Sequence, residues 1–160
     1  MKTIIPINED LRQQVVDLTA ARWGSSIIAT KGKTHNVADL DGFAVMTDGK
    51  ITGYITYAII DHECEIVSLD SLVENQGIGT ALIEKVIETC RENKCTRIWL
   101  LTTNDNTNTI RFYQKRGFNM SGLNINAIRE ERKIKPEIPL IGFDGIPILH
   151  EIEFEMYLTD

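Results

Sequence analysis

The sequence predicts a single α/β (α+β) domain, residues 1–160, in which a mixed, mostly antiparallel sheet is flanked by helices. The length of 160 residues suits one domain, and a hydrophobic content of 42% suffices for one sizeable core. Strand-like segments joined by short turns run from residue 43 to residue 73, which is typical of an antiparallel meander. Helix-like and strand-like segments alternate after that point.

The N-terminal segments predict a strand, a helix and a loop. Residues 3–7 are few and β-branched, which favours an edge strand. Asn8 is suited to cap a helix over residues 9–22, because acidic side chains then occupy the first turn, at the positive end of the helix dipole. Residues 23–41 lack a clear period, so they predict a loop with some extended backbone.

The central segments predict the meander itself. Residues 43–46 read as its first strand, and the Asp-Gly pair at 48–49 is a hairpin turn signal. Residues 50–60 then form the returning strand. The chain turns again at residues 61–63, and residues 64–73 form the third strand.

The pattern changes after the meander, and the next segments predict helices that pack on the sheet. Between residues 78 and 90 the apolar side chains cover one arc at the helical period, so this helix lies on the sheet. Residues 98–101 are continuously apolar, as in a strand that is buried on both faces. Asn106 opens a second helix, and Gly117 closes it as a C-terminal cap.

The last two strands, residues 118–125 and 151–158, are separated by a long connection, residues 126–149. The connection holds more apolar side chains than a solvated linker would, and its prolines and glycines stiffen its path. The charges of residues 129–133 balance one another, which predicts a solvated helical turn there. We therefore expect the connection to be ordered and packed against the domain.

Composition narrows the classes of function. With 17 Lys and Arg against 23 Asp and Glu the net charge is −6, which disfavours nucleic acid as a partner. The three cysteines, Cys64, Cys90 and Cys95, lack the spacing of metal ligands and predict core residues in a reducing compartment. The sequence shows neither a signal-peptide pattern at residues 1–10 nor an apolar run of membrane-spanning length. A soluble cytoplasmic protein without a metal site is expected.

The first candidate motif is a glycine-containing junction between strand and helix at residues 74–82. Gly77 and Gly79 allow a ligand to approach the backbone closely, and amides at a helix N-terminus suit a pyrophosphate. The motif is not a P-loop, because no Gly-Lys-Ser/Thr follows, and it lacks the third glycine of the dinucleotide fingerprint. Taken alone, it fits a tight packing turn equally well.

The second candidate motif is the helix that ends in Gly117 and Phe118. Taken alone, it predicts an amphipathic helix with a glycine cap. Tyr113 would then be a core aromatic whose hydroxyl reaches the surface.

At this spacing the two motifs together resemble the GCN5-related N-acetyltransferase (GNAT) superfamily. That family pairs a Gly-rich pyrophosphate loop with a later Asn-x-x-Ala-x-x-x-Tyr-x-x-x-Gly-Phe helix. The matching residues are Asn106, Tyr113, Gly117 and Phe118, while Thr109 stands where Ala is usual. The resemblance runs from about Phe43 to Phe118, and the order of strands agrees outside the motifs.

The loop departs from the family pattern, which has Gln or Arg at its first position. An ungapped match places Glu74 there, and an acid would face phosphates. A shorter loop would bring Gln76 into play instead.

The resemblance implies an acetyl-CoA-dependent N-acetyltransferase that moves an acetyl group directly to a primary amine of a small molecule or peptide, without a metal. It assigns the following residues to acetyl-CoA: Leu72 and Val73 for the pantetheine arm, Gln76, Gly77, Ile78, Gly79 and Thr80 for the pyrophosphate, and Asn106 for the CoA arm or the order of the strands. Tyr113 would protonate the leaving thiolate.

The general base is left among several candidates. Glu65 and Asp70 lie on the third meander strand, where the pattern favours for each an exposed carboxylate on the solvent face of an antiparallel sheet over a catalytic one. His35 lies in the predicted loop at residues 31–35, which lines the acceptor site in many members of the family.

An acyl-CoA-binding sensor or regulatory module with little catalysis is the alternative, and Glu74 at the phosphate loop favours it. Asn106 and Tyr113 favour the enzyme. The connection at 126–149 is expected to cover the acceptor side of the cleft or to supply a homodimer contact.

Overall fold

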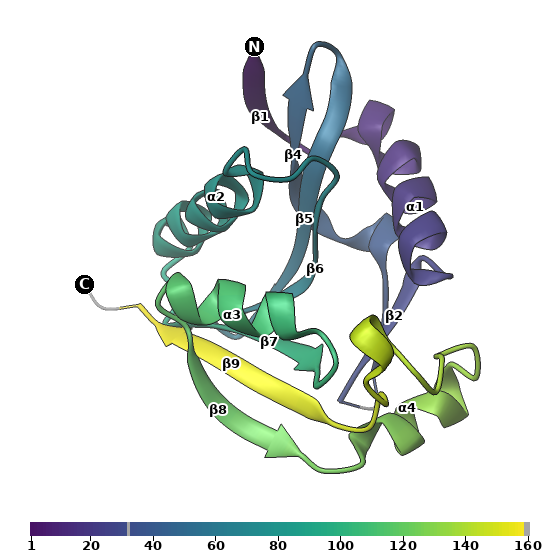
Figure 1. Ribbon diagram of the computed structural model, residues 1–160. Helices are drawn as coiled ribbons and strands as arrows, with labels where there is room; N and C mark the ends of the chain where they lie inside the picture. Colours follow the sequence, from purple (N-terminus) through teal and green to yellow (C-terminus); the bar gives the residue numbers. More distant parts are fainter. Residues whose placement is uncertain (32, 159–160) are drawn as a thin grey trace.

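Over residues 1–31 and 33–158, which the computed structural model describes, the chain forms a seven-stranded sheet and a separate two-stranded hairpin (Figure 1). The elements in chain order are β1 (Lys2–Pro6), α1 (Glu9–Trp23), β2 (Ile27–Thr30), β3 (Lys33–Asn36), η1 (Val37–Asp39), β4 (Asp41–Thr47), β5 (Lys50–Ile60), β6 (Glu63–Ser71), α2 (Ile78–Glu92), β7 (Arg97–Thr103), α3 (Thr107–Lys115), β8 (Asn119–Asn124), α4 (Ala127–Ile134), η2 (Phe143–Gly145) and β9 (Glu151–Tyr157).

The large sheet is mixed and mostly antiparallel, as the sequence predicts. Its strand order is β1-β4-β5-β6-β7-β9-β8, and β6 with β7 is its parallel pair. The predicted meander is β4-β5-β6, and its first hairpin turns at Asp48 and Gly49, which both have positive φ. β1 pairs with β4 at one edge of the sheet, which confirms the predicted edge strand.

Helices cover both faces of the sheet (Figure 1). α2 and α3 lie on one face, where the apolar arc of α2 packs with Tyr113, Phe118 and Phe154 in the larger core cluster. α1 lies on the other face, where Leu11 and Val15 pack in a second cluster. Within the described ranges, no helix is long and apolar enough to cross a membrane.

The structure differs from the sequence-based prediction in two segments. Residues 23–41 are not mainly loop, because β2 and β3 pair as an antiparallel hairpin there, from Ile27 with Asn36 to Thr30 with Lys33. The sequence missed it because β3 is polar and shows no apolar alternation. Residues 129–133 belong to α4, which buries Glu131 rather than leaving every charge solvated.

The sheet opens in its middle, between β6 and β7. These strands pair in parallel from Glu63 with Arg97 to Glu65 with Trp99, and the pairing stops there. Both strands continue beyond that point, β6 paired with β5 and β7 paired with β9. The opening lies at the end of the sheet towards which both strands run, and it forms the site described below.

A buried hydrogen-bond chain ties α1 to β5 and β6. The Thr19 hydroxyl donates to the Val15 carbonyl oxygen at 2.8 Å and lies 3.0 Å from the Tyr54 hydroxyl. Tyr54 in turn donates to Asp70 Oδ2 at 2.9 Å. Tyr54 and Thr19 are fully buried, so these hydroxyls have no access to water as a substitute partner.

The variant Tyr54→Phe is expected to lower the free energy of unfolding by about 1–3 kcal/mol, because it leaves a buried Asp70 oxygen without its donor. Urea denaturation measures the change. Tyr57→Phe is the matched control, since the structure gives the Tyr57 hydroxyl no hydrogen bond with any described residue. Equal losses of unfolding free energy in the two variants would contradict the stabilising role of this hydrogen-bond chain.

Candidate active site

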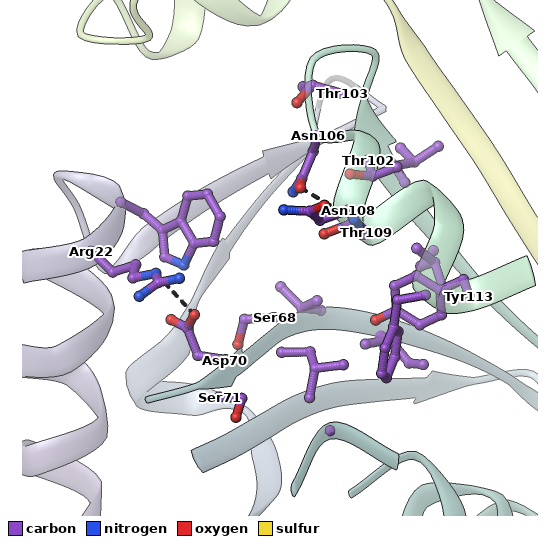
Figure 2. A pocket seen from close by; sticks show the side chains of 18 of the residues that line it. Arg22, Ser68, Asp70, Ser71, Thr102, Thr103, Asn106, Asn108, Thr109 and Tyr113 are labelled. Carbon is purple, nitrogen blue, oxygen red and sulfur yellow. Dashed lines mark hydrogen bonds and ion pairs between the residues drawn. The ribbon is translucent and has the colours of Figure 1, made fainter. Parts of the chain in front are cut away.

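A cleft of about 830 Å³ occupies the opening between β6 and β7. One wall is β6 from Ile66 to Ser71, and the facing wall is the end of β7 with α3. Residues 74–80 line one end of the cleft, and Glu151 with residues of β2 lines another part. Figure 2 shows Ser68 and Asp70 on one side and Tyr113 on the other.

A β-bulge in β6 lies next to the point where the strands part. Thr56 pairs with Ser68, whereas Tyr57 pairs with Ile66, so Val67 is the extra residue. The hydroxyls of Thr56 and Ser68 are hydrogen-bonded to each other below it. Because β7 no longer pairs with this stretch, backbone groups on that edge of β6 are available to a ligand in the cleft.

The loop before α2 presents free backbone amides to the cleft. Gly77 is the N-cap of α2 with φ +69°, a left-handed conformation that favours glycine, and no side chain caps the helix. The amides of the first turn therefore carry the positive end of the helix dipole towards the cleft. At Gly79 a Cβ atom would lie 3.1 Å from the Phe112 ring, so this glycine also lets α2 approach α3 closely.

Arg116, which the sequence analysis missed, adds a full positive charge beside this loop. Its Nε and Nη2 atoms donate to the Thr80 hydroxyl at 2.9 and 2.7 Å, and its guanidinium lies 4.0 Å from the centre of the Phe112 ring. Glu74 also lines the cleft, and it is exposed. The positive charge beside this loop thus comes from the end of α3, which is remote in sequence.

Tyr113 lies inside the cleft wall with 3% of its surface exposed. Its ring meets Phe112 and Phe118 edge to face, with 5.2 Å between centroids in each pair. The hydroxyl points into the cleft (Figure 2), and the structure gives it no hydrogen bond with a described residue. Burial raises the pKa of the phenol, so Tyr113 carries its proton at neutral pH.

Most of the other predicted cofactor residues line the cleft, and two do not. Asn106 lines the cleft and caps α3, where its side chain accepts from the Thr109 amide at 3.4 Å. Gln76, Gly77, Ile78, Gly79 and Thr80 line the cleft as a group. Leu72 and Val73 follow the end of β6 outside the cleft lining, and the Leu72 amide donates to the Thr52 carbonyl oxygen.

The two predicted carboxylates are buried, which makes their expected solvent exposure wrong. Asp70 is 3% exposed and is held by Tyr54 and by Arg22 Nε at 3.1 Å. Burial raises the pKa of Asp70, and these two partners oppose that rise. Glu65 is 7% exposed, and His35 of β3 lies 3.0 Å from its Oε1 atom. α1 and the β2–β3 hairpin cover this face of the sheet, so it is not a solvent face.

Glu151, at the start of β9, is a third buried carboxylate that the sequence analysis did not single out. It is 6% exposed and lines the cleft. Burial above all, and then the negative charges of Glu131 and Glu65, raises the pKa of Glu151 to about 7, while Lys31 opposes the rise. The alternation of β9 shows which face Glu151 takes, but no local pattern shows that this face is covered.

The end of the long connection is fastened at the start of α3. Asn104 Oδ1 accepts from the amides of Leu149 and His150 at 2.9 Å each, and Asp105 Oδ2 accepts from the Phe143 amide at 3.1 Å. These bonds hold Phe143 and Asp144 beside the cleft, which both residues line.

The comparisons with known proteins agree with this geometry. Residues 12–118 match the acetyltransferase (GNAT) family. The uncharacterized proteins YdhI and YxbD of Bacillus subtilis (strain 168) are 46% and 44% identical to the chain, over 96% and 93% of its length and 97% and 94% of theirs. The fold is similar to that of a GNAT family acetyltransferase from Elizabethkingia anophelis with acetyl-CoA bound (TM-score 0.70, 20% identity, 98% of each chain covered).

The variant Glu151→Gln is expected to raise the melting temperature at pH 8 and to leave it unchanged near pH 4. The pKa of Glu151 is about 7 in the folded protein against 4.5 ordinarily, so ionisation destabilises the fold increasingly as the pH rises through this window. Gln does not ionise and avoids this loss.

Thermal unfolding followed from pH 4 to pH 8 measures the difference. Glu84→Gln, on the exposed face of α2, is the control and is expected to show no such trend. A difference for Glu151→Gln that is independent of pH would contradict the raised pKa.

Proposed function

The chain belongs to the GNAT family of acetyltransferases, and we propose that it moves the acetyl group of acetyl-CoA directly to a primary amine of a small molecule or peptide. The observation that carries the proposal is the opening between β6 and β7, with free helix amides at one end and the Tyr113 hydroxyl in its wall. A structural neighbour solved with acetyl-CoA bound supports the choice of cofactor.

In this proposal the pyrophosphate binds at the N-terminus of α2. The amides of residues 77–80 would donate to its oxygens, and Arg116 would neutralise part of its charge. The pantetheine arm would then run along the unpaired edge of β6, where backbone groups can pair with its amides as a strand would. Asn106 would border the same arm.

The thioester would lie where the strands part, beside Tyr113. The acceptor must lose a proton before its nitrogen lone pair attacks the thioester carbonyl carbon. As the tetrahedral intermediate collapses, the C–S bond breaks and the thiolate takes the phenol proton of Tyr113. Tyr113 would recover a proton from the nitrogen of the new amide. Asp70 and Glu65 are candidates for the first proton transfer, although each already has partners.

A screen for free thiol with acetyl-CoA and a range of amines tests the proposal. Transfer to an amine, with the acetylated product identified by mass spectrometry, supports the enzyme. Tight CoA binding without transfer to any amine would favour the acyl-CoA sensor instead. The observation that supports this second role is the exposed Glu74 in the loop.

The variant Tyr113→Phe is expected to lower kcat by about 100-fold, with acetyl-CoA affinity within about twofold of the parent, because it removes the proton donor and keeps the packed ring. Steady-state kinetics and calorimetry measure the two quantities. Tyr57→Phe, outside the cleft, serves as the control. An unchanged kcat would reduce Tyr113 to a packing residue.

The variant Arg116→Met is expected to weaken acetyl-CoA binding by about tenfold, because it removes a charge-assisted donor next to the α2 amides. Arg111→Met changes an exposed arginine of the same helix that does not line the cleft, and its affinity should stay that of the parent. Similar losses in both variants would mean that only net charge matters.

A further inference from the structure

Another part of the cleft is lined by Thr30 of β2, by Lys135 and Phe143 of the connection after α4, and by Glu151 of β9. The face of β9 that carries Glu151 is the face opposite Phe154, so it is not the side on which Tyr113 packs. A cofactor at Tyr113 and a second molecule at Glu151 would therefore approach the opening from opposite faces of the sheet.

Glu151 differs from the other glutamates of its strand face. Glu153 bonds to Lys31 at 2.6 Å and to Arg97 at 3.0 Å, and Glu155 bonds to Arg97 at 2.8 Å. The Glu151 carboxylate, in contrast, makes no hydrogen bond or ion pair within residues 1–31 and 33–158, although only 6% of the surface of this residue is exposed. Such a group is costly to hold without a partner.

Glu65 of β6 also has a carboxylate oxygen without a partner in the described part of the chain. Its Oε1 atom meets His35, but its Oε2 atom is buried and has no hydrogen-bond partner among the described residues. The charged or titratable groups around Glu151 are Glu65 of β6, Glu131 of α4, Lys31 next to β2, His35 of β3, and Lys135 after α4. Lys31 is already engaged by Glu153 and by the Trp99 ring at 4.3 Å, so negative charge prevails.

We propose that Glu151 binds the acceptor's ammonium group in the cleft, with the negative charges of Glu65 and Glu131 behind it, and that the acceptor is a cationic aliphatic amine without a neighbouring carboxylate. The proposal rests on the acetyltransferase function proposed above and names the acceptor class for that site. A cation at Glu151 provides the partner that this carboxylate lacks, whereas an anion would meet uncompensated negative charge. A metal ion is a poorer occupant, because no three acidic, His or Cys side chains of the described chain are arranged to hold one.

Glu151 is also the group that takes the first proton. In its ionised form the carboxylate accepts one proton from R–NH3⁺, which leaves R–NH2 and a neutral carboxylic acid. The amine nitrogen then forms the C–N bond, and the C–S bond breaks with its electron pair on sulfur. Sulfur takes the phenol proton of Tyr113, the amide nitrogen returns one proton to Tyr113, and Glu151 later releases its proton to water. The sum is R–NH3⁺ and acetyl-CoA giving the amide, CoA thiol and one proton.

This assignment has a pH signature. Because the pKa of Glu151 is about 7, burial being the largest cause, its basic form accumulates as the pH rises through neutrality. The value of kcat/KM should therefore rise with an inflection near pH 7. Glu151→Gln should lose this inflection, and only the rise from the acceptor's own deprotonation should remain.

Two acceptors with four-carbon chains test the pocket: 1,4-diaminobutane and 4-aminobutanoate carry the same primary amine, but the far end bears an ammonium in the first and a carboxylate in the second. The wild-type protein is expected to favour the diamine in kcat/KM by at least about tenfold at low salt, with butylamine between them. Glu151→Gln should lower kcat/KM for the diamine by about 100-fold, reduce the preference for it, and keep acetyl-CoA affinity within about twofold.

Glu155→Gln is the matched control, since it lies on the same face of β9 outside the cleft lining, and its preference between acceptors should be that of the parent. Calorimetry of the diamine with the CoA-bound protein gives a second measurement, independent of turnover. Preference for 4-aminobutanoate, or full activity and diamine affinity in Glu151→Gln, would overturn the pocket while the acetyltransferase function stood. Failure of the wild-type protein to acetylate any amine would overturn the proposed function and the pocket with it.

Discussion

The structure depends on the separation of β6 and β7 after Glu65 and Trp99. Each strand is held by its other neighbour, since β5 follows β6 to Ser71 and β9 follows β7 to Thr103. Beyond Glu65 and Trp99 the two strands no longer pair with each other, and their facing backbone groups are unpaired in the interior of the sheet. A regular sheet would have used these groups in its own hydrogen bonds.

The two faces of the sheet contribute different chemistry to this opening. On the face of α2 and α3 the core is apolar, and it supports the Tyr113 ring while the α2 amides and Arg116 supply positive charge at one end. On the other face, α1 and the β2–β3 hairpin bury three carboxylates against the sheet. Asp70 is held by two partners and Glu65 by one, whereas Glu151 has none among the described residues. This difference is the basis for proposing that Glu151, and not Asp70, meets the charge of a ligand.

Much of the fold could be predicted because its signals are local. The Asp-Gly turn at 48–49, the Asn8 cap and the apolar arc of α2 each lie within a few residues, and the structure contains all of them. The hairpin at 27–36 was missed, because both strands are only four residues long and β3 is polar, so no apolar alternation marks the pair. The sequence also misjudged the solvent exposure of Glu65 and Asp70, since burial on a sheet face depends on elements that pack on it from elsewhere in the chain.

By itself, the sequence determined the meander, the mixed sheet and the helices α1, α2 and α3, because periodicity, caps and turn residues act over short distances. Its two motifs resemble those of the GNAT family. Only the tertiary structure decided which charges meet in the cleft. It brought Arg116 to Thr80 across two helices, and it left Glu151 buried without a partner among the described residues, beside a hairpin more than 100 residues away in sequence. The energy of a buried charge depends on every element around it, and no local pattern of residues contains that information.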